Sequence, residues 1–234
     1  MWCAAQPHLL IGAQGALQDY SLLTTHFSLF VKVFMITELI IATGNKHKVE
    51  EIKDVLRDLG VKIVPMADMP SFPKTVEDGA TLEENAAKKA REAALFYNKW
   101  ALSDDTGLEV DFLNGAPGVY SARFAGEHCS YEDNNKKLLS LLKDVPPEKR
   151  TAKFACVIAI SNPKGECSFA RGEIYGIITD KISGSNGFGY DPVFFVPQEN
   201  KTFAELSSEE KNKISHRAKA LQEAKKRIKA ISSE

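Results

Sequence analysis

Apolar residues are distributed along this chain in two patterns. Short continuous apolar runs predict strands, and apolar residues spaced three or four positions apart predict helices. Residues 38–43 are a short run rich in Ile and Leu, which is typical of a buried strand. Residues 46–59 instead carry apolar side chains three or four positions apart, on one face of a helix that Gly60 ends. A second short strand is predicted at 61–65.

The middle of the chain predicts a long helix followed by two strands. Thr81 with Glu84 three residues later forms a capping box, which predicts the start of an Ala-rich helix running to about Tyr97. The segment "WALSDDTGLEVDFL", at 100–113, predicts two strands separated by an acidic turn at 104–107.

The last third predicts a hairpin and two helices. Strands at 151–161 and 166–180 flank the turn "NPKG" and should pair as an antiparallel hairpin. Ser207 and Ser215 then begin the two C-terminal helices. Strands that alternate with helices, together with one long hairpin, indicate an α/β protein with a mixed sheet in one domain.

Composition narrows the class of protein. The 234 residues are 44% hydrophobic and 26% charged, an ordinary globular composition with enough apolar residues for one core or two lobes. The net charge of -1 gives no basic field for nucleic acid, and no apolar run approaches the roughly 20 residues of a membrane helix. None of the four cysteines forms a C-x-x-C pair, so we expect no zinc site and a reduced, cytoplasmic protein.

The first 34 residues differ from the rest. They have almost no charge, no clear period and no pattern of a signal peptide, and Met35 immediately precedes the first good strand. We therefore expect 1–34 to be an extension, preferably explained by an over-extended gene start and alternatively by an accessory segment. The functional domain is expected at 35–234.

A polar turn follows the first strand. "TGNKHK", at 43–48, puts hydroxyl, amide and basic side chains before a predicted helix, whose N-terminal N–H groups and positive dipole end suit phosphate. Neither the P-loop pattern nor G-x-G-x-x-G is present. The alternative is that Asn45 merely caps the helix and the lysines are solvated.

Acidic residues gather at two further places. Asp104 and Asp105, in "SDDTG", end an apolar strand, where open α/β sheets bind ligands. Two close carboxylates repel unless a cation joins them, and oxygen ligands favour Mg²⁺. The alternative is an ordinary capped turn. Glu77, in "VEDG", is a weaker candidate for a further carboxylate.

Two later segments have side chains suited to a nucleobase. "GFGYDP", at 187–192, offers Phe188 and Tyr190 for stacking and Asp191 to accept from a ring N–H, although aromatic residues of such a loop also pack in cores. His216 and Arg217 lie in the first turn of a helix, where the dipole disfavours cations. Their position predicts an anion or a carbonyl oxygen for them to meet, the alternative being a solvated basic helix.

Five motifs occur in order along the chain: "TGNKHK", "SDDTGLEVDFLNGAPGVYSARFAG", "GFGYDPVFF", "KTFAEL" and "EEKNKISHRAKAL". Together they resemble the inosine triphosphate pyrophosphatase family, whose members clear non-canonical purine nucleoside triphosphates. The resemblance runs from about Leu39 to the last helix and leaves out only the N-terminal extension. Thr106 is a local variation, because Ser is frequent at that position; both residues keep a hydroxyl.

The resemblance implies a fold and a reaction. The fold would be a bent mixed β-sheet with flanking helices that form two lobes around a central cleft, usually assembled as a homodimer. The reaction would hydrolyse ITP, dITP, XTP or dXTP at the α-phosphorus, giving the monophosphate and pyrophosphate, with Mg²⁺ as cofactor.

The resemblance also implies residue roles. Asp105 would be the catalytic base, and Glu77, Asp104 and Asp105 would face the metal. Hypoxanthine and xanthine carry a 6-oxo acceptor, so donors from His216 and Arg217 would favour these bases over adenine. The residues implied to hold the substrate are Thr43, Gly44, Asn45, Lys46, His47, Lys48, Thr106, Phe188, Gly189, Tyr190, Asp191, Lys211, His216 and Arg217.

Other functions remain open on the sequence. A nucleotide pyrophosphatase of the Maf-like group resembles this architecture, but "SHR" and "GFGYDP" argue against it. The intact Lys48, Asp104 and Asp105 argue against a catalytically silent nucleotide-binding protein. A turnover measurement decides between an active enzyme and such a binding protein. A nucleic-acid-binding module is disfavoured because the basic residues are local and the net charge is near zero.

Overall fold

A central mixed sheet organises the protein. The computed structural model describes residues 36–233, so the expectation for residues 1–34 lies outside the described residues. The main path of the sheet is β2-β1-β3-β5-β6-β7-β8, and β4 pairs with β3 beside it. The strands are β1 (Glu38–Ile41), β2 (Lys62–Pro65), β3 (Trp100–Val110), β4 (Pro117–Gly118), β5 (Thr151–Ser161), β6 (Cys167–Ile178), β7 (Phe194–Val196) and β8 (Lys201–Thr202).

The pairing of these strands confirms the predicted mixed sheet. β1 pairs with β2 and β3 in parallel, whereas the remaining pairs are antiparallel. The predicted hairpin is confirmed, with Thr151 opposite Ile177 and Ser161 opposite Cys167. The two kinds of pairing therefore meet at β3, which has a parallel neighbour on one side and an antiparallel one on the other.

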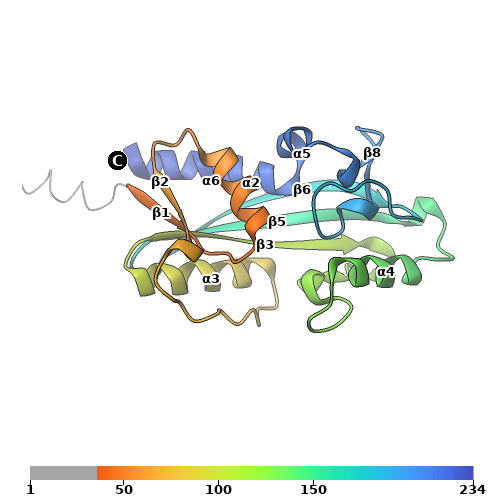
Figure 1. Ribbon diagram of the computed structural model, residues 1–234, viewed down its shortest axis with the longest axis horizontal. Coiled ribbons are helices and arrows are strands. Elements are labelled where there is room, and N and C mark those ends of the chain that lie inside the picture. The colour runs from red at the N-terminus through yellow and green to blue at the C-terminus, as the bar shows by residue number, and fades with distance from the viewer. Residues whose placement is uncertain (1–35, 234) are drawn as a thin grey trace, which may run out of the picture.

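Helices cover both faces of the sheet. They are α2 (Lys46–Leu56), α3 (Leu82–Tyr97), α4 (Tyr131–Leu141), α5 (Ser208–Ile214) and α6 (His216–Ser233). Figure 1 shows α2 and α6 on one face and α3 on the other, with α4 beside the far end of the long strands. No helix within residues 36–233 has the length and apolar character needed to cross a membrane.

Apolar side chains pack into clusters at the two ends of the long strands. At one end Leu56 of α2, Leu102 of β3 and Leu221 of α6 are fully buried in one cluster. At the other end Leu108 of β3 lies with Phe194 and other residues that follow the hairpin. Since the same strands run through both clusters, the molecule has two lobes that share one sheet, as the family resemblance implied.

Polar side chains cap the helix starts, as in the alternative interpretation given for Asn45, although the box predicted before α3 is incomplete. The side chain of Asn45 accepts from the N–H groups of His47 and Lys48 at the start of α2. Ser207 forms a full capping box with Glu210. In the box predicted before α3, Thr81 accepts from the Glu84 N–H, but the Glu84 carboxylate accepts from Ala80 instead of Thr81.

The acidic turn predicted at 104–107 is wrong, because β3 is continuous from Trp100 to Val110. Asp and Gly favour turns, but here each residue from Ala101 to Val110 has a partner on β5, and that pairing outweighs local preference. A Cβ on Gly107 would lie 2.7 Å from the carbonyl oxygen of Gly118. The glycine therefore permits the close approach of β4 and forms no turn.

Candidate active site

Asp104 and Asp105 lie in a strand, so their side chains point to opposite faces of the sheet. Asp104 faces Lys48 of α2 and Arg217 of α6, whereas Asp105 faces Lys89 of α3. Each aspartate has its own basic partners on its own side of β3, and the expectation that a Mg²⁺ ion joins the two carboxylates stays a prediction.

The Asp104 side is a buried ion cluster. Asp104 is fully buried, and its Oδ2 lies 2.9 Å from Lys48 Nζ and 3.1 Å from both Nε and Nη2 of Arg217. Burial disfavours the charged form of Asp104, but the two cations outweigh burial and hold its pKa well below 3.8. Glu51 pairs with Nη1 of Arg217, and Nη2 also donates to the Thr106 hydroxyl at 3.2 Å. Arg217 thus meets the anions expected at this helix start, and they come from the protein itself.

The Asp105 side is a smaller and more open cluster. Lys89 Nζ lies 2.9 Å from Asp105 Oδ1 and 3.1 Å from Glu77 Oε1, and it donates to the Asp104 carbonyl oxygen at 2.8 Å. Asn85 Nδ2 donates to Asp105 Oδ2 at 3.4 Å. Burial raises the pKa of Asp105 above 3.8 despite the opposing effect of Lys89. Asp105 is therefore a better proton acceptor than an exposed aspartate.

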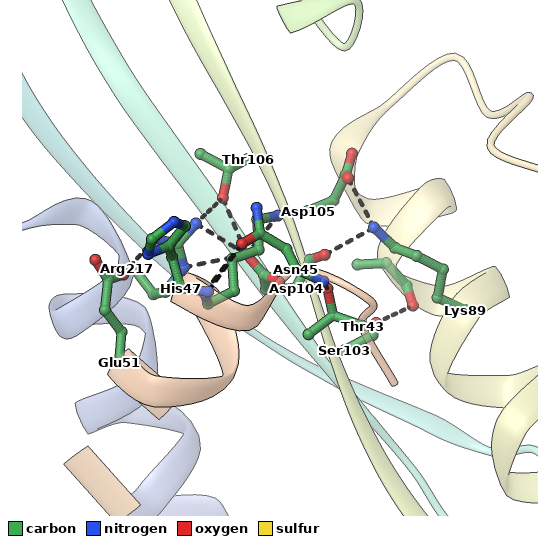
Figure 2. Close-up of polar contacts among 12 residues, drawn as sticks. Thr43, Asn45, His47, Glu51, Lys89, Ser103, Asp104, Asp105, Thr106 and Arg217 are labelled. Carbon is green, nitrogen blue, oxygen red and sulfur yellow. Dashed lines mark hydrogen bonds and ion pairs between the residues drawn. The ribbon is translucent and has the colours of Figure 1, made fainter. Parts of the chain in front are cut away.

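Figure 2 shows how the loop that carries Thr43 and Asn45 lies between the Asp104 cluster and the Asp105 cluster. Thr43 and Asn45 lie between Arg217 on one side and Lys89 on the other. The Asn45 N–H donates to Thr43 Oγ1 at 3.3 Å, which fixes the turn into α2. The loop thus brings the positive end of α2 to a place where basic residues from α2, α3 and α6 converge.

A single cavity brings together most of the residues predicted to hold a substrate. Asn45, Lys48 and Thr106 line it, together with four residues at 188–191 and with Lys211, His216 and Arg217. Four of the residues predicted to hold a substrate do not line this cavity, and neither do Glu77, Asp104 and Asp105. Thr43 is half-buried at the turn, and Gly44, Lys46 and His47 are exposed.

The far end of the cavity has aromatic walls and buried polar groups. His216 stacks on Phe154 with ring centroids 4.6 Å apart, and its Nδ1 is buried without a hydrogen-bond partner among the described residues. Burial lowers the pKa of His216 well below 6.5, so the ring is neutral and retains one N–H donor. Asp191 pairs with Lys211 at 2.6 Å. Tyr190 is a buried wall residue whose hydroxyl donates to the Ser121 carbonyl oxygen.

Several residues of the site were missed by sequence reasoning. Asn85 and Lys89 are four positions apart on α3, so they share a helix face that also buries alanines, and that break in an apolar stripe was a usable signal. Glu51 follows His47 by four residues in the same way. Tyr131 and Asn134 of α4 line the cavity but come from a segment with no motif of its own.

Oxygen ligands suited to a hard cation are present on one side of β3. The Glu77 and Asp105 carboxylates converge on the Lys89 ammonium. Lys48 and Arg217 occupy Oδ2 of Asp104, whereas its Oδ1 is buried without a hydrogen-bond partner among the described residues. Among the described residues no group of three or more His, Cys, Asp and Glu side chains is arranged to hold a metal ion. The donor set fits a Mg²⁺ held by one or two carboxylates together with substrate phosphates.

Comparison with known proteins places this arrangement in a family. A model of the Ham1 family matches residues 39–227. A Desulforamulus reducens protein named dITP/XTP pyrophosphatase is 53% identical over 187 residues, covering 80% of this chain and 93% of that protein. One of the same name from Clostridium perfringens is 48% identical, covering 83% and 98%.

Solved structures agree with the sequence comparison. The structure of a HAM1 protein from Coxiella burnetii is 40% identical with a TM-score of 0.76, covering 82% of this chain and 98% of that one. The Staphylococcus aureus Ham1 protein is 42% identical with a TM-score of 0.74 at the same coverage. The sequence match, the shared fold and the matched length lead to one conclusion: this chain belongs to the Ham1 family.

Proposed function

We propose that the protein hydrolyses non-canonical purine nucleoside triphosphates, ITP, dITP, XTP and dXTP, to the monophosphate and pyrophosphate. The observation that carries the proposal is the single cavity in which the start of α2 and Lys48 meet the stacking and hydrogen-bonding groups of Phe188, Asp191 and His216. The relatives named dITP/XTP pyrophosphatase support the same substrate class.

The triphosphate is held where positive charge converges. Lys48 and Lys89 approach β3 from opposite faces of the sheet, and the positive end of the α2 dipole lies at the loop that leads into Lys46. Phosphoryl transfer depends on positioning and charge neutralisation more than on covalent help, and this loop supplies both.

Asp105 is the group we assign to orient and deprotonate the attacking water. Its raised pKa makes it the stronger base of the two adjacent aspartates, because Asp104 is stabilised as an anion by two cations. We assign Asp104 to hold Lys48 and Arg217 in place, which replaces the role beside a metal that the sequence suggested for it.

Mg²⁺ is the cofactor we propose, with Glu77 and Asp105 as its protein ligands. Held there, the ion would supply positive charge that offsets the negative charge of the phosphates during the reaction. Lys89 contacts both carboxylates, so it holds them together and offsets their mutual repulsion.

Base selection follows from the donors that remain free. A guanidinium has five N–H groups, and four of those of Arg217 are used by Asp104, Glu51 and Thr106. Among the described residues, one N–H of Arg217 and the N–H of the neutral His216 ring remain for a 6-oxo group. Adenine offers a 6-amino donor instead, which would leave these groups unpaired.

We also propose a homodimer, on the basis of an exposed apolar patch on α3. Leu95 and Phe96 are 52% and 54% exposed, and Phe96 contacts Phe72 of the preceding loop at 5.2 Å between ring centroids. Such a patch fits association of two copies. Sedimentation equilibrium of the protein and of Phe96→Glu would test it, because the substitution should yield a monomer.

The proposed function is tested by product analysis across a nucleotide panel. Purified protein is incubated with ITP, XTP, GTP and ATP, with and without Mg²⁺, and pyrophosphate and orthophosphate are measured separately. Pyrophosphate released from ITP and XTP only with the divalent ion is the expected result. Orthophosphate as the first product would show that attack is not at the α-phosphorus, and equal rates on all four substrates would refute base selection.

A further inference from the structure

A hydrogen bond joins the two lobes at the mouth of the cavity. Asn45, which caps α2 in one lobe, donates from Nδ2 to the hydroxyl of Tyr131 at 3.3 Å. Tyr131 is the first residue of α4 in the other lobe and is 45% exposed. These two residues are 86 positions apart in the chain, and both line the cavity.

The amide of Asn45 serves both lobes at once. Its Oδ1 accepts from the N–H groups of His47 and Lys48 at 3.0 and 3.4 Å, so the oxygen is committed to the start of α2. Only the Nδ2 end remains for a partner, and Tyr131 supplies an acceptor for it. The Tyr131 hydroxyl thereby restrains the residue that shapes the start of α2.

Ring contacts add to this link. Phe188 stacks on His47 at 5.3 Å between centroids with an interplanar angle of 16°, and it lies 6.0 Å from the Tyr131 ring. Phe188 is flanked by Gly187 and Gly189, both at positive φ, so its loop has a backbone that L side chains rarely adopt. Phe188, which lines the cavity, is thus packed against His47 of the loop at 43–48 and against the Tyr131 ring.

We propose that Tyr131 is a positioning residue for the reaction. Its hydrogen bond to Asn45 holds the loop at 43–48 against the part of the cavity formed by Phe188, and so keeps the bound nucleotide in the cavity. This rests on the proposed function of the same cavity. The bond closes the cavity on the side where Tyr131 is exposed, so its loss should loosen the hold on a bound nucleotide. Because the hydroxyl acts through Asn45, its removal should weaken retention of the nucleotide more than it slows the chemical step.

The test compares Tyr131→Phe with the unaltered protein. This change removes one hydroxyl and keeps the ring that contacts Phe188. Loss of a neutral hydrogen bond predicts a dissociation rate of inosine monophosphate about two- to tenfold faster, and a KM for ITP raised by a similar factor with a smaller change in kcat. Tyr175→Phe is the matched control, because Tyr175 is also exposed, with its hydroxyl bonded to Glu173 on β6 away from the cavity.

A double-mutant cycle adds a readout that a merely structural role would not move. Asn45→Ser keeps an N-cap oxygen but removes the amide donor. In that background Tyr131→Phe should have no further effect on monophosphate dissociation. An unchanged dissociation rate in Tyr131→Phe, an equal effect of Tyr175→Phe, or full additivity in the cycle would each overturn the proposal.

The experiment separates this inference from the proposed function. Dissociation of inosine monophosphate is measured without turnover, so a protein that binds it but releases no pyrophosphate from ITP would refute the reaction and still decide the role of Tyr131. Failure of the unaltered protein to bind inosine nucleotides would overturn both.

Discussion

Replacing each of the two neighbouring aspartates by asparagine should produce opposite defects. Asp104 is fully buried, and its Oδ2 accepts from Lys48 and Arg217, so Asp104→Asn leaves two cations without their main counter-charge. Removing one partner of a buried ion pair costs about 3–5 kcal/mol, which for a chain of this size lowers Tm by about 6–20 °C. Glu51 still pairs with Arg217 in this variant, so we expect the lower half of that range.

Asp105→Asn should keep the fold and lose the reaction. Burial raises the pKa of Asp105, so the folded state disfavours its charged form and loses no electrostatic stability when an amide replaces it. Lys89 retains Glu77 as a partner. Removal of a general base lowers the rate by about 10²–10⁴.

Thermal melting followed by circular dichroism, and pyrophosphate release from ITP, measure the two defects on the same samples. Each variant serves as the control for the other, because the substitution is identical and the positions are adjacent. A Tm of Asp105→Asn as low as that of Asp104→Asn would refute the assignment of the aspartates to opposite faces with different tasks. Full activity of Asp105→Asn would remove it as the base.

Three other outcomes are expected. Arg217→Ala should reduce kcat/KM for ITP and XTP more than for ATP, and an equal loss on all three would move base selection to His216 or Asp191. Glu77→Gln should raise the Mg²⁺ concentration required for half-maximal rate, checked by titration, whereas an unchanged requirement would exclude Glu77 as a ligand. The acid limb of kcat/KM should lie above pH 3.8, because the base works only when deprotonated and the pKa of Asp105 is raised. Stability should also fall in acid, but at lower pH, because the lowered pKa of Asp104 contributes stability that is complete above 3.8 and is lost as the pH falls below it, which acid unfolding measures.

Local pattern was sufficient for most of the elements. The period of apolar residues predicted α2, the Thr81–Glu84 box before an Ala-rich stretch predicted α3, and the turn "NPKG" predicted the β5–β6 hairpin, because such signals arise between residues close in the chain. Ser207 and Asn45 marked helix starts for the same reason: a cap bonds to N–H groups only two or three residues away.

The site was recognisable in the sequence as motifs, and its assembly was decided by tertiary structure. The local preferences of "SDDTG" predicted a turn, but pairing with β5 makes the segment part of a strand. Because side chains alternate along a strand, Asp104 and Asp105 point to opposite faces of the sheet. Lys89 has no motif, because its partners lie on β3 and in the loop that carries Glu77.

The same distinction applies to Arg217. Its place in the first turn of a helix predicted an anionic partner. The sequence did not identify that partner as the carboxylates of Glu51 and of Asp104, which lies 113 residues earlier. Side-chain chemistry and short-range periodicity are properties of the chain itself. Which charges meet in a buried site depends on how the sheet is ordered, because burial removes water and leaves only the neighbours that folding brings within reach.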